Sequence, residues 1–98
     1  MNEQIRHISE IDRIVHEPGR LMIMALLSAV ERADFLYLQH ETELNKGTLS
    51  SHLARLEEAG YVDIEKTYRG KVPQTLLRLT RAGRRAFKEY RKKLKRAL

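Results

Sequence analysis

The sequence predicts a mainly α-helical fold that contains one small β-hairpin. Apolar residues recur at intervals of three and four through most of the 98 residues, as they do along one face of an α-helix. The exception is the segment 61–79, where apolar and polar residues alternate as in a β-strand. A chain of this length can bury one modest core, so we expect residues 1–98 to form a single domain.

The first helix is expected over residues 3–16. Ile5, Ile8, Ile11 and Val15 follow one another at intervals of three and four, which places them on one apolar stripe. The remaining positions are mostly charged or polar. This segment is therefore predicted to be an amphipathic helix.

Two further helices are expected before the middle of the chain. The segment 18–31 begins with Pro18, which suits the first position of a helix, and it is apolar nearly all round, as in a buried central helix. The segment 35–42 follows Asp34, whose side chain can cap a helix N-terminus. In the turn that follows, Glu43 is the residue best placed for a positive φ, which would cost about 1 kcal/mol. Either this turn differs from the usual one or the cost is tolerated. The candidate core residues of the 35–42 helix are Phe35, Leu36 and Leu38.

A fourth helix, expected over 46–59 between a cap at Asn45 and a left-handed Gly60, has two different faces. One face is an apolar stripe of leucines, and the other carries small or short polar side chains and one long cation. Such a face suits close contact with a surface that is read by hydrogen bonds. We interpret it as a recognition helix for the DNA major groove. The apolar stripe is Leu49, Leu53 and Leu56, and the opposite face holds Gly47, Thr48, Ser51 and Arg55.

The segment 61–79 is expected to form a two-stranded hairpin. Its turn is Arg69-Gly70-Lys71, in which Gly70 is free to adopt a positive φ and the two cations lie at the tip. The turn is either an ordinary solvated loop or a wing that touches DNA phosphates or the minor groove. We favour the wing because the hairpin directly follows the predicted recognition helix.

The last helix is expected over 80–97, with Thr80 as its cap and an apolar seam at intervals of three and four. Residues 80–98 contain nine Lys or Arg and one Glu, a balance of +8. These cations are either solvated surface or a source of potential felt by a polyanion. The seam and the N-terminal stripe are expected to pack across a two-fold axis in a homodimer. The predicted interface residues are Ile5, Ile8, Ile11, Val15, Phe87, Tyr90 and Leu94.

The net charge of +6 is distributed unevenly. Residues 1–43 hold four Lys or Arg against eight Asp or Glu, or −4, whereas residues 44–98 hold fifteen against five, or +10. A basic half that contains the predicted recognition helix is typical of a nucleic-acid-binding protein. The chain has no cysteine, no long apolar run and no signal-peptide pattern, so we expect a soluble cytoplasmic protein that has no membrane segment.

The order of four helices, two strands and a helix is that of a winged helix-turn-helix. The strings GTLSSHL (47–53), LEEAGYV (56–62) and LTRAGR (79–84) resemble the DNA-binding domain of MarR-like and ArsR-like bacterial and archaeal transcriptional regulators, especially the stand-alone, single-domain ones. The match covers 20–90. It implies that the terminal helices form the dimer and that the recognition helices enter successive major grooves. It also implies DNA contacts from Lys46, Gly47, Thr48, Ser50, Ser51, His52 and Arg55, and from the wing residues Arg69, Gly70 and Lys71.

The favoured function is a sequence-specific regulator that binds double-stranded DNA as a homodimer on a pseudo-palindromic operator. The alternatives are a sequence-neutral nucleic-acid or chromatin-binding protein and a winged-helix module for protein interaction. We expect no enzyme, catalytic residue, cofactor or metal site, because the four histidines are dispersed and lack a suitable carboxylate partner. A cleft for a small apolar effector between the terminal helices and the central domain is left open, as is constitutive binding.

Overall fold

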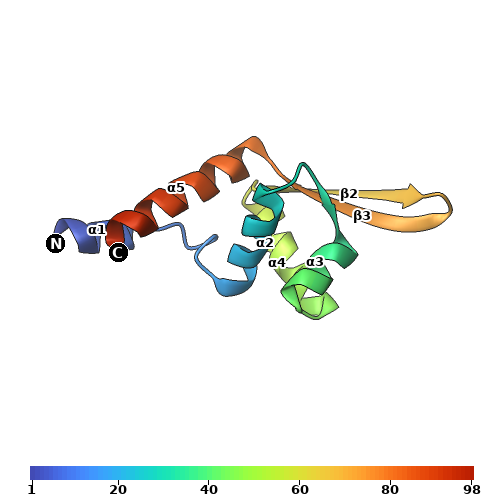
Figure 1. Cartoon of the computed structure of the whole chain (residues 1–98), viewed down its shortest axis with the longest axis horizontal. Coiled ribbons are helices and arrows are strands. Elements are labelled where there is room, and N and C mark those ends of the chain that lie inside the picture. The colour runs from blue at the N-terminus through green and yellow to red at the C-terminus, as the bar shows by residue number, and fades with distance from the viewer.

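The chain folds into five helices and a small antiparallel sheet, which confirms the predicted fold class (Figure 1). The computed structural model describes all 98 residues. The helices are α1 (Glu3–Ser9), α2 (Pro18–Ser28), α3 (Phe35–Thr42), α4 (Lys46–Glu58) and α5 (Arg81–Ala97). The strands are β1 (Ala33–Asp34), β2 (Val62–Arg69) and β3 (Val72–Leu79).

The molecule is elongated, with extents of 57 × 25 × 21 Å. In Figure 1, α2, α3 and α4 cluster in the middle, the β2–β3 hairpin projects at one end, and α1 with the end of α5 lies at the other. The sheet order is β1-β3-β2, so β3 is the central strand. The short strand β1 was not predicted, because two residues are too few to give an alternating pattern; it exists through its pairing with Leu76 and Leu77 of β3.

Polar side chains begin the helices as the sequence predicted. The Asn45 Oδ1 atom accepts the N–H of Thr48 at 2.8 Å, and Asp34 and Thr80 cap α3 and α5 in the same way. Each cap satisfies one of the backbone N–H groups that a helix N-terminus leaves without an internal partner. Glu43 ends α3 with φ 57° and ψ 17°, so of the two alternatives for this turn, the left-handed conformation is adopted and its cost is tolerated.

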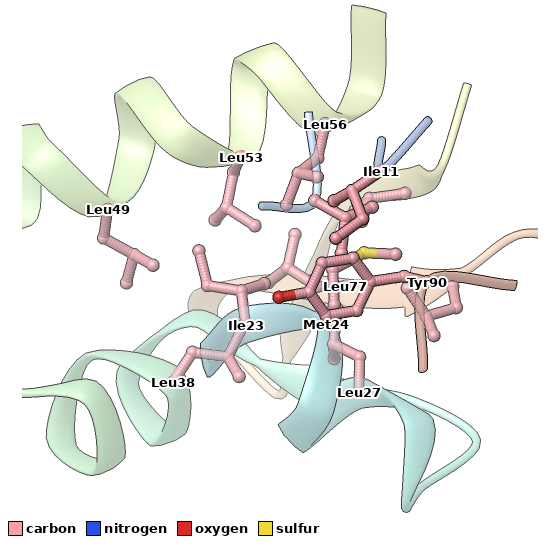
Figure 2. Close-up of a cluster of buried hydrophobic side chains, with 13 residues drawn as sticks. Ile11, Ile23, Met24, Leu27, Leu38, Leu49, Leu53, Leu56, Leu77 and Tyr90 are labelled. Atoms are coloured by element: carbon pink, nitrogen blue, oxygen red, sulfur yellow. The ribbon is translucent and has the colours of Figure 1, made fainter. Parts of the chain in front are cut away.

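One hydrophobic core joins all parts of the chain except α1. Figure 2 shows the leucine stripe of α4 facing Ile23 of α2, with Leu38 of α3 and Leu77 of β3 in the same cluster. The predicted stripe of α4 is confirmed, since Leu49, Leu53 and Leu56 are all buried. Each fully buried aliphatic side chain of this kind contributes about 1.5–3 kcal/mol through removal of apolar surface from water.

The N-terminal helix is shorter than expected. It ends at Ser9 rather than continuing to residue 16, and the segment 10–17 forms turns. Within this segment the Asp12 carboxylate accepts the backbone N–H groups of Ile14 and Val15, a local arrangement that competes with the helix. Helix α2 likewise ends at Ser28, before the predicted boundary at 31.

One predicted core contact of α3 is wrong. Leu38 is fully buried and Phe35 packs against the core, but Leu36 is 72% exposed. Leu36 lies two residues from Leu38, which is about 200° around the helix, so the two side chains point in nearly opposite directions. Residue 36 therefore belongs to the outer surface.

Substitution of Glu43 by glycine is expected to stabilise the fold. A non-glycine residue in the left-handed conformation is strained, and glycine removes that strain at the cost of a more flexible unfolded chain. We expect Glu43→Gly to raise the free energy of unfolding by about 0.5–1 kcal/mol in urea titrations. Glu43→Ala keeps the Cβ atom and is the matched control. An equal gain in both variants would assign the effect to the lost charge and contradict the explanation by strain.

Candidate nucleic-acid interface

The side of α4 that points away from the core carries mostly small residues. Gly47, Ser50, Ser51, Ala54 and Arg55 are all exposed, and we call these five residues the reading face. No acidic residue occurs in α4 before Glu57. Short side chains let a helix backbone approach a surface closely, while hydroxyl groups and one guanidinium supply hydrogen bonds. The exposed Lys46 stands at the first turn beside this face.

Ala54 is a member of this face that the sequence analysis missed. It follows Ser50 and Ser51 by four and three residues, so it lies one turn further along the same surface of the helix. The spacing was visible in the sequence, but an alanine carries no polar group to draw attention. Its methyl group adds an apolar contact point next to Arg55.

His52 was predicted to contact DNA, and the structure places it elsewhere. Its side chain is only 17% exposed, and its Nδ1 atom lies 3.5 Å from Glu17 Oε2 and 3.4 Å from Arg20 Nη1. A methyl group at Gly19 would lie 2.5 Å from His52 Nε2. His52 therefore lies on the inner side of α4 and packs against the start of α2. It is not part of the reading face. The predicted residue Thr48 is half-buried, with its backbone N–H held by the Asn45 cap.

Glu17 organises this junction between α2 and α4. Its carboxylate accepts the backbone N–H groups of Gly19 at 3.1 Å and Arg20 at 2.9 Å, and so caps the N-terminus of α2. Burial alone would raise the pKa of Glu17, but these N–H groups and the neighbouring His52 and Arg20 lower it below its usual 4.5. The ionised form of Glu17 is thus favoured in the folded protein.

The wing is the β2–β3 hairpin. Arg69, Gly70 and Lys71 are exposed at its tip, and Gly70 has the expected positive φ of 64°. Apolar side chains accompany the cations, since Tyr68 is 70% and Val72 is 65% exposed. The alternating pattern of the strands gave no sign that these two positions would remain uncovered.

A groove of about 530 Å³ connects the reading face to the wing. Lys46 and Ser50 of α4 line one side, and Lys66 and Gln74 of the hairpin line the other. The groove is mixed in character, since apolar side chains and the carboxylate of Asp34 also line it, and it does not reach the tip of the wing. The apolar lining residues are Phe35, Leu36, Leu53, Ile64 and Pro73. Lys66 and Gln74 were not predicted, because only the folded hairpin brings the middle of its strands beside α4.

Comparison with known proteins identifies the family of the chain. Residues 20–98 match the family model of the winged helix DNA-binding domain. The chain belongs to this winged helix DNA-binding family.

The winged-helix chain also has relatives over most of its length. It is 39% identical over 79 residues to an uncharacterized protein of Methanocaldococcus jannaschii, which covers 80% of this chain and 85% of that protein. It is similar to the structure of a transcriptional regulator homologue from Pyrococcus horikoshii, with a TM-score of 0.86 and 31% identity over 96% of this chain and 92% of that one. A MarR-family regulator from Silicibacter pomeroyi shares the fold at a TM-score of 0.69, with 20% identity over 96% of this chain and 62% of that one.

These matches confirm the predicted winged-helix DNA-binding domain and the predicted likeness in fold to a MarR-family regulator. They show that the chain is a DNA-binding protein of the transcriptional-regulator class. The prediction that it is not an enzyme is confirmed, because its family and its relative of known structure are DNA-binding regulators. None of the helices has the length and apolar character needed to cross a membrane.

The structure corrects part of the predicted dimer interface of this winged-helix protein. Ile11, Val15 and Tyr90 are buried within the protomer, because the 10–17 segment and α5 both fold onto its own core. Two further predicted residues, Phe87 and Leu94, are partly buried against the same core. Of the seven residues, only Ile5 and Ile8 of α1 are exposed, by 47% and 51%.

Charged and apolar side chains together line the space between the 10–17 segment and α5. A hollow of about 450 Å³ there is lined by five charged side chains together with Tyr61, Tyr90 and two alanines. The Tyr61 hydroxyl donates to the Asp12 carboxylate at 2.5 Å, which together with burial raises the pKa of Tyr61 to about 12. The five charged residues are Glu10, Asp12, Arg85, Glu89 and Lys93.

The Glu17 cap predicts a pH-dependent contribution to stability. Because folding lowers the pKa of Glu17, its stabilising effect is fully present above about 4.5 and is lost as the pH falls through the lowered value. We expect Glu17→Gln to lower the melting temperature at pH 7 and to approach the wild type at pH 3, as measured by circular dichroism. A difference that stays constant from pH 7 to pH 3 would contradict a role for the ionised carboxylate.

Proposed function

We propose that the protein is a sequence-specific regulator that binds double-stranded DNA as a homodimer, with α4 in the major groove. The main support for this proposal is the reading face. It combines exposed small residues, two hydroxyls and a guanidinium with an absence of acidic groups through its first turns. A face of this kind supports close approach to base edges, whereas an ordinary solvated helix face carries long side chains of both signs.

The chemistry of the reading face supports direct readout of bases. Ser50 and Ser51 each provide a hydroxyl that donates or accepts, and the Ala54 methyl suits the methyl group of thymine. The Arg55 guanidinium suits the O6 and N7 atoms of guanine, the commonest specific contact in the major groove. Discrimination would therefore come from the first three turns of α4.

Cations around the reading face supply contacts to phosphates. Lys46 lies at the start of α4, Lys66 borders the groove, and Arg69 and Lys71 form the tip of the wing. None of these four side chains forms an ion pair within the protein. They are free to replace the counterions of DNA, which makes affinity fall steeply with salt concentration.

The dimer is proposed to form through α1. Ile5 and Ile8 are exposed on this helix, and Gln4 Nε2 donates to the Ala97 carbonyl at 3.1 Å, which holds α1 beside the end of α5. The exposed Met1 and Leu98 lie at the same end of the molecule (Figure 1). A two-fold axis here would direct the two reading faces to half-sites about 34 Å apart on a pseudo-palindromic site.

The two alternative functions make different predictions. Winged-helix modules for protein interaction tend to lack cations on the recognition helix and the wing, whereas this chain has exposed cations on both. A sequence-neutral binder would use the same cations but would show no large ratio of specific to non-specific affinity. Selection of bound fragments from a random DNA pool at near-physiological salt separates the three functions. We expect an enriched pseudo-palindrome; salt-sensitive binding without enrichment supports the neutral binder, and no binding supports the interaction module.

Arg55→Ala is expected to weaken binding to the selected operator by about 10- to 100-fold, the usual value of one bidentate contact to a base. Binding to random DNA should change much less, because a base contact adds little there. Fluorescence anisotropy on both duplexes measures the ratio. Arg32→Ala, which removes an exposed arginine outside the interface, is the matched control. Equal losses on operator and random DNA would show that Arg55 contacts phosphate only.

Charge placed on α1 is expected to break the dimer. In Ile5→Asp/Ile8→Asp, desolvation of two carboxylates at the proposed interface opposes association, while the monomer core is untouched because neither side chain is buried. Light scattering should report a dimer for the wild type and a monomer for the variant, with unchanged circular dichroism. A variant that remains dimeric would place the interface elsewhere.

A further inference from the structure

Five cations share one face of α5. Arg84, Lys88, Arg91 and Lys95 follow one another at intervals of four, three and four, and Lys92 lies beside them. We call these five residues the cationic stripe. They border a shallow hollow of about 460 Å³ whose lining contains no acidic residue. From Arg84 to Lys95 the stripe is about 16 Å long.

The stripe carries positive charge that the protein itself leaves largely uncompensated. Like charges three or four residues apart destabilise a helix by about 0.2–0.5 kcal/mol per pair. The only ion pair within α5 joins Lys92 Nζ to Glu89 Oε1 at 3.7 Å. An external anion that approaches this face would relieve the remaining repulsion.

Two of the cations are already held in place. Arg84 donates to the carbonyl groups of Ser28 at 3.4 Å and Val30 at 3.0 Å, just beyond the end of α2. The Arg91 guanidinium lies 5.9 Å from the centre of the Phe87 ring. Ordered arginines lose less conformational entropy when they bind an anion, so this part of the surface is preorganised.

The stripe lies apart from the reading face. Helix α2 packs between α4 and α5 (Figure 1). His52 of α4 contacts the start of α2, whereas Arg84 of α5 contacts the segment at its end, about 16 Å away along the helix. DNA bound to α4 is thus separated from the cationic stripe by the body of the protein.

We propose that the cationic stripe binds the phosphate backbone of a second DNA duplex, so that one molecule joins two duplex segments. This inference rests on the proposed binding of a first duplex by α4. A duplex is the partner that fits, because phosphates repeat about every 3.4 Å along each strand and a row of cations about 16 Å long spans several of them. Contacts to phosphates need no particular base sequence, so the second segment is captured through charge alone.

A bridging assay tests the proposal. A biotinylated 60-base-pair duplex on beads is saturated with the 98-residue protein and washed at low salt. A fluorescent duplex of unrelated sequence is then added, and its retention is measured. Wild-type protein should retain it, and Lys88→Gln/Lys95→Gln should reduce retention by about tenfold. The slope of log affinity against log salt for the second duplex should fall by about 2.

Arg85→Gln/Arg96→Gln is the matched control, because it removes two exposed cations from α5 outside the stripe. This variant should retain the second duplex as the wild type does. Equal loss in both double variants would show a general charge effect and overturn the proposal, as would unchanged retention after the stripe substitutions. If the stripe variant no longer binds the first duplex on the beads, the stripe belongs to the primary site, which also overturns the proposal.

A second arrangement separates this inference from the proposed function. The protein is attached to beads through a biotin at its N-terminus, with the reading face blocked by Ser51→Glu. We expect the Ser51→Glu protein to retain the duplex and to lose it when Lys88→Gln/Lys95→Gln is added. That result supports DNA binding by the stripe even if α4 does not bind DNA. If the stripe substitutions instead reduce retention of phosphatidylserine vesicles and leave duplex retention unchanged, the partner is an anionic membrane and the proposal is wrong.

Discussion

The buried face of α2 holds the other elements in position. Ile23, Met24 and Leu27 are fully buried, and they meet the leucine stripe of α4, Leu38 of α3 and Leu77 of β3 (Figure 2). Because protein interiors are packed as densely as crystals, a shift of α2 would move every helix that touches it. The orientation of the reading face relative to the wing is therefore a property of this single core.

Two close approaches fix the helices around that core. Gly19 lets His52, at the middle of α4, lie against the start of α2. Gly83 lies so close to the Tyr61 carbonyl that any Cβ atom there would collide with backbone, and this contact sets the start of α5 at the base of the wing. The approach at Gly83 is the stricter one, because a Cβ atom there would meet backbone, whereas a Cβ atom at Gly19 would meet only the end of the His52 side chain.

Exposed positive charge and engaged negative charge lie in different parts of the molecule. The excess of positive charge in residues 44–98 is carried by the start of α4, the wing and α5. The acidic residues of the N-terminal part include structural ones, since Glu17 caps α2 and Asp12 holds the 10–17 turns and the Tyr61 hydroxyl. Exposed cations remain available to anionic partners, while these two carboxylates are engaged inside the protein.

The sequence alone determined α2 to α5 and the β2–β3 hairpin apart from some of their ends, because helical spacing, caps and turn residues act over a few positions. Asn45, Glu43 and Gly70 adopt their predicted conformations for that reason. Only the tertiary structure decided which side chains those elements leave exposed. His52 turns inward to Glu17, and Tyr90 is buried in its own protomer, since both depend on neighbours far away in the chain. Local spacing contains no information on such contacts, which follow from packing.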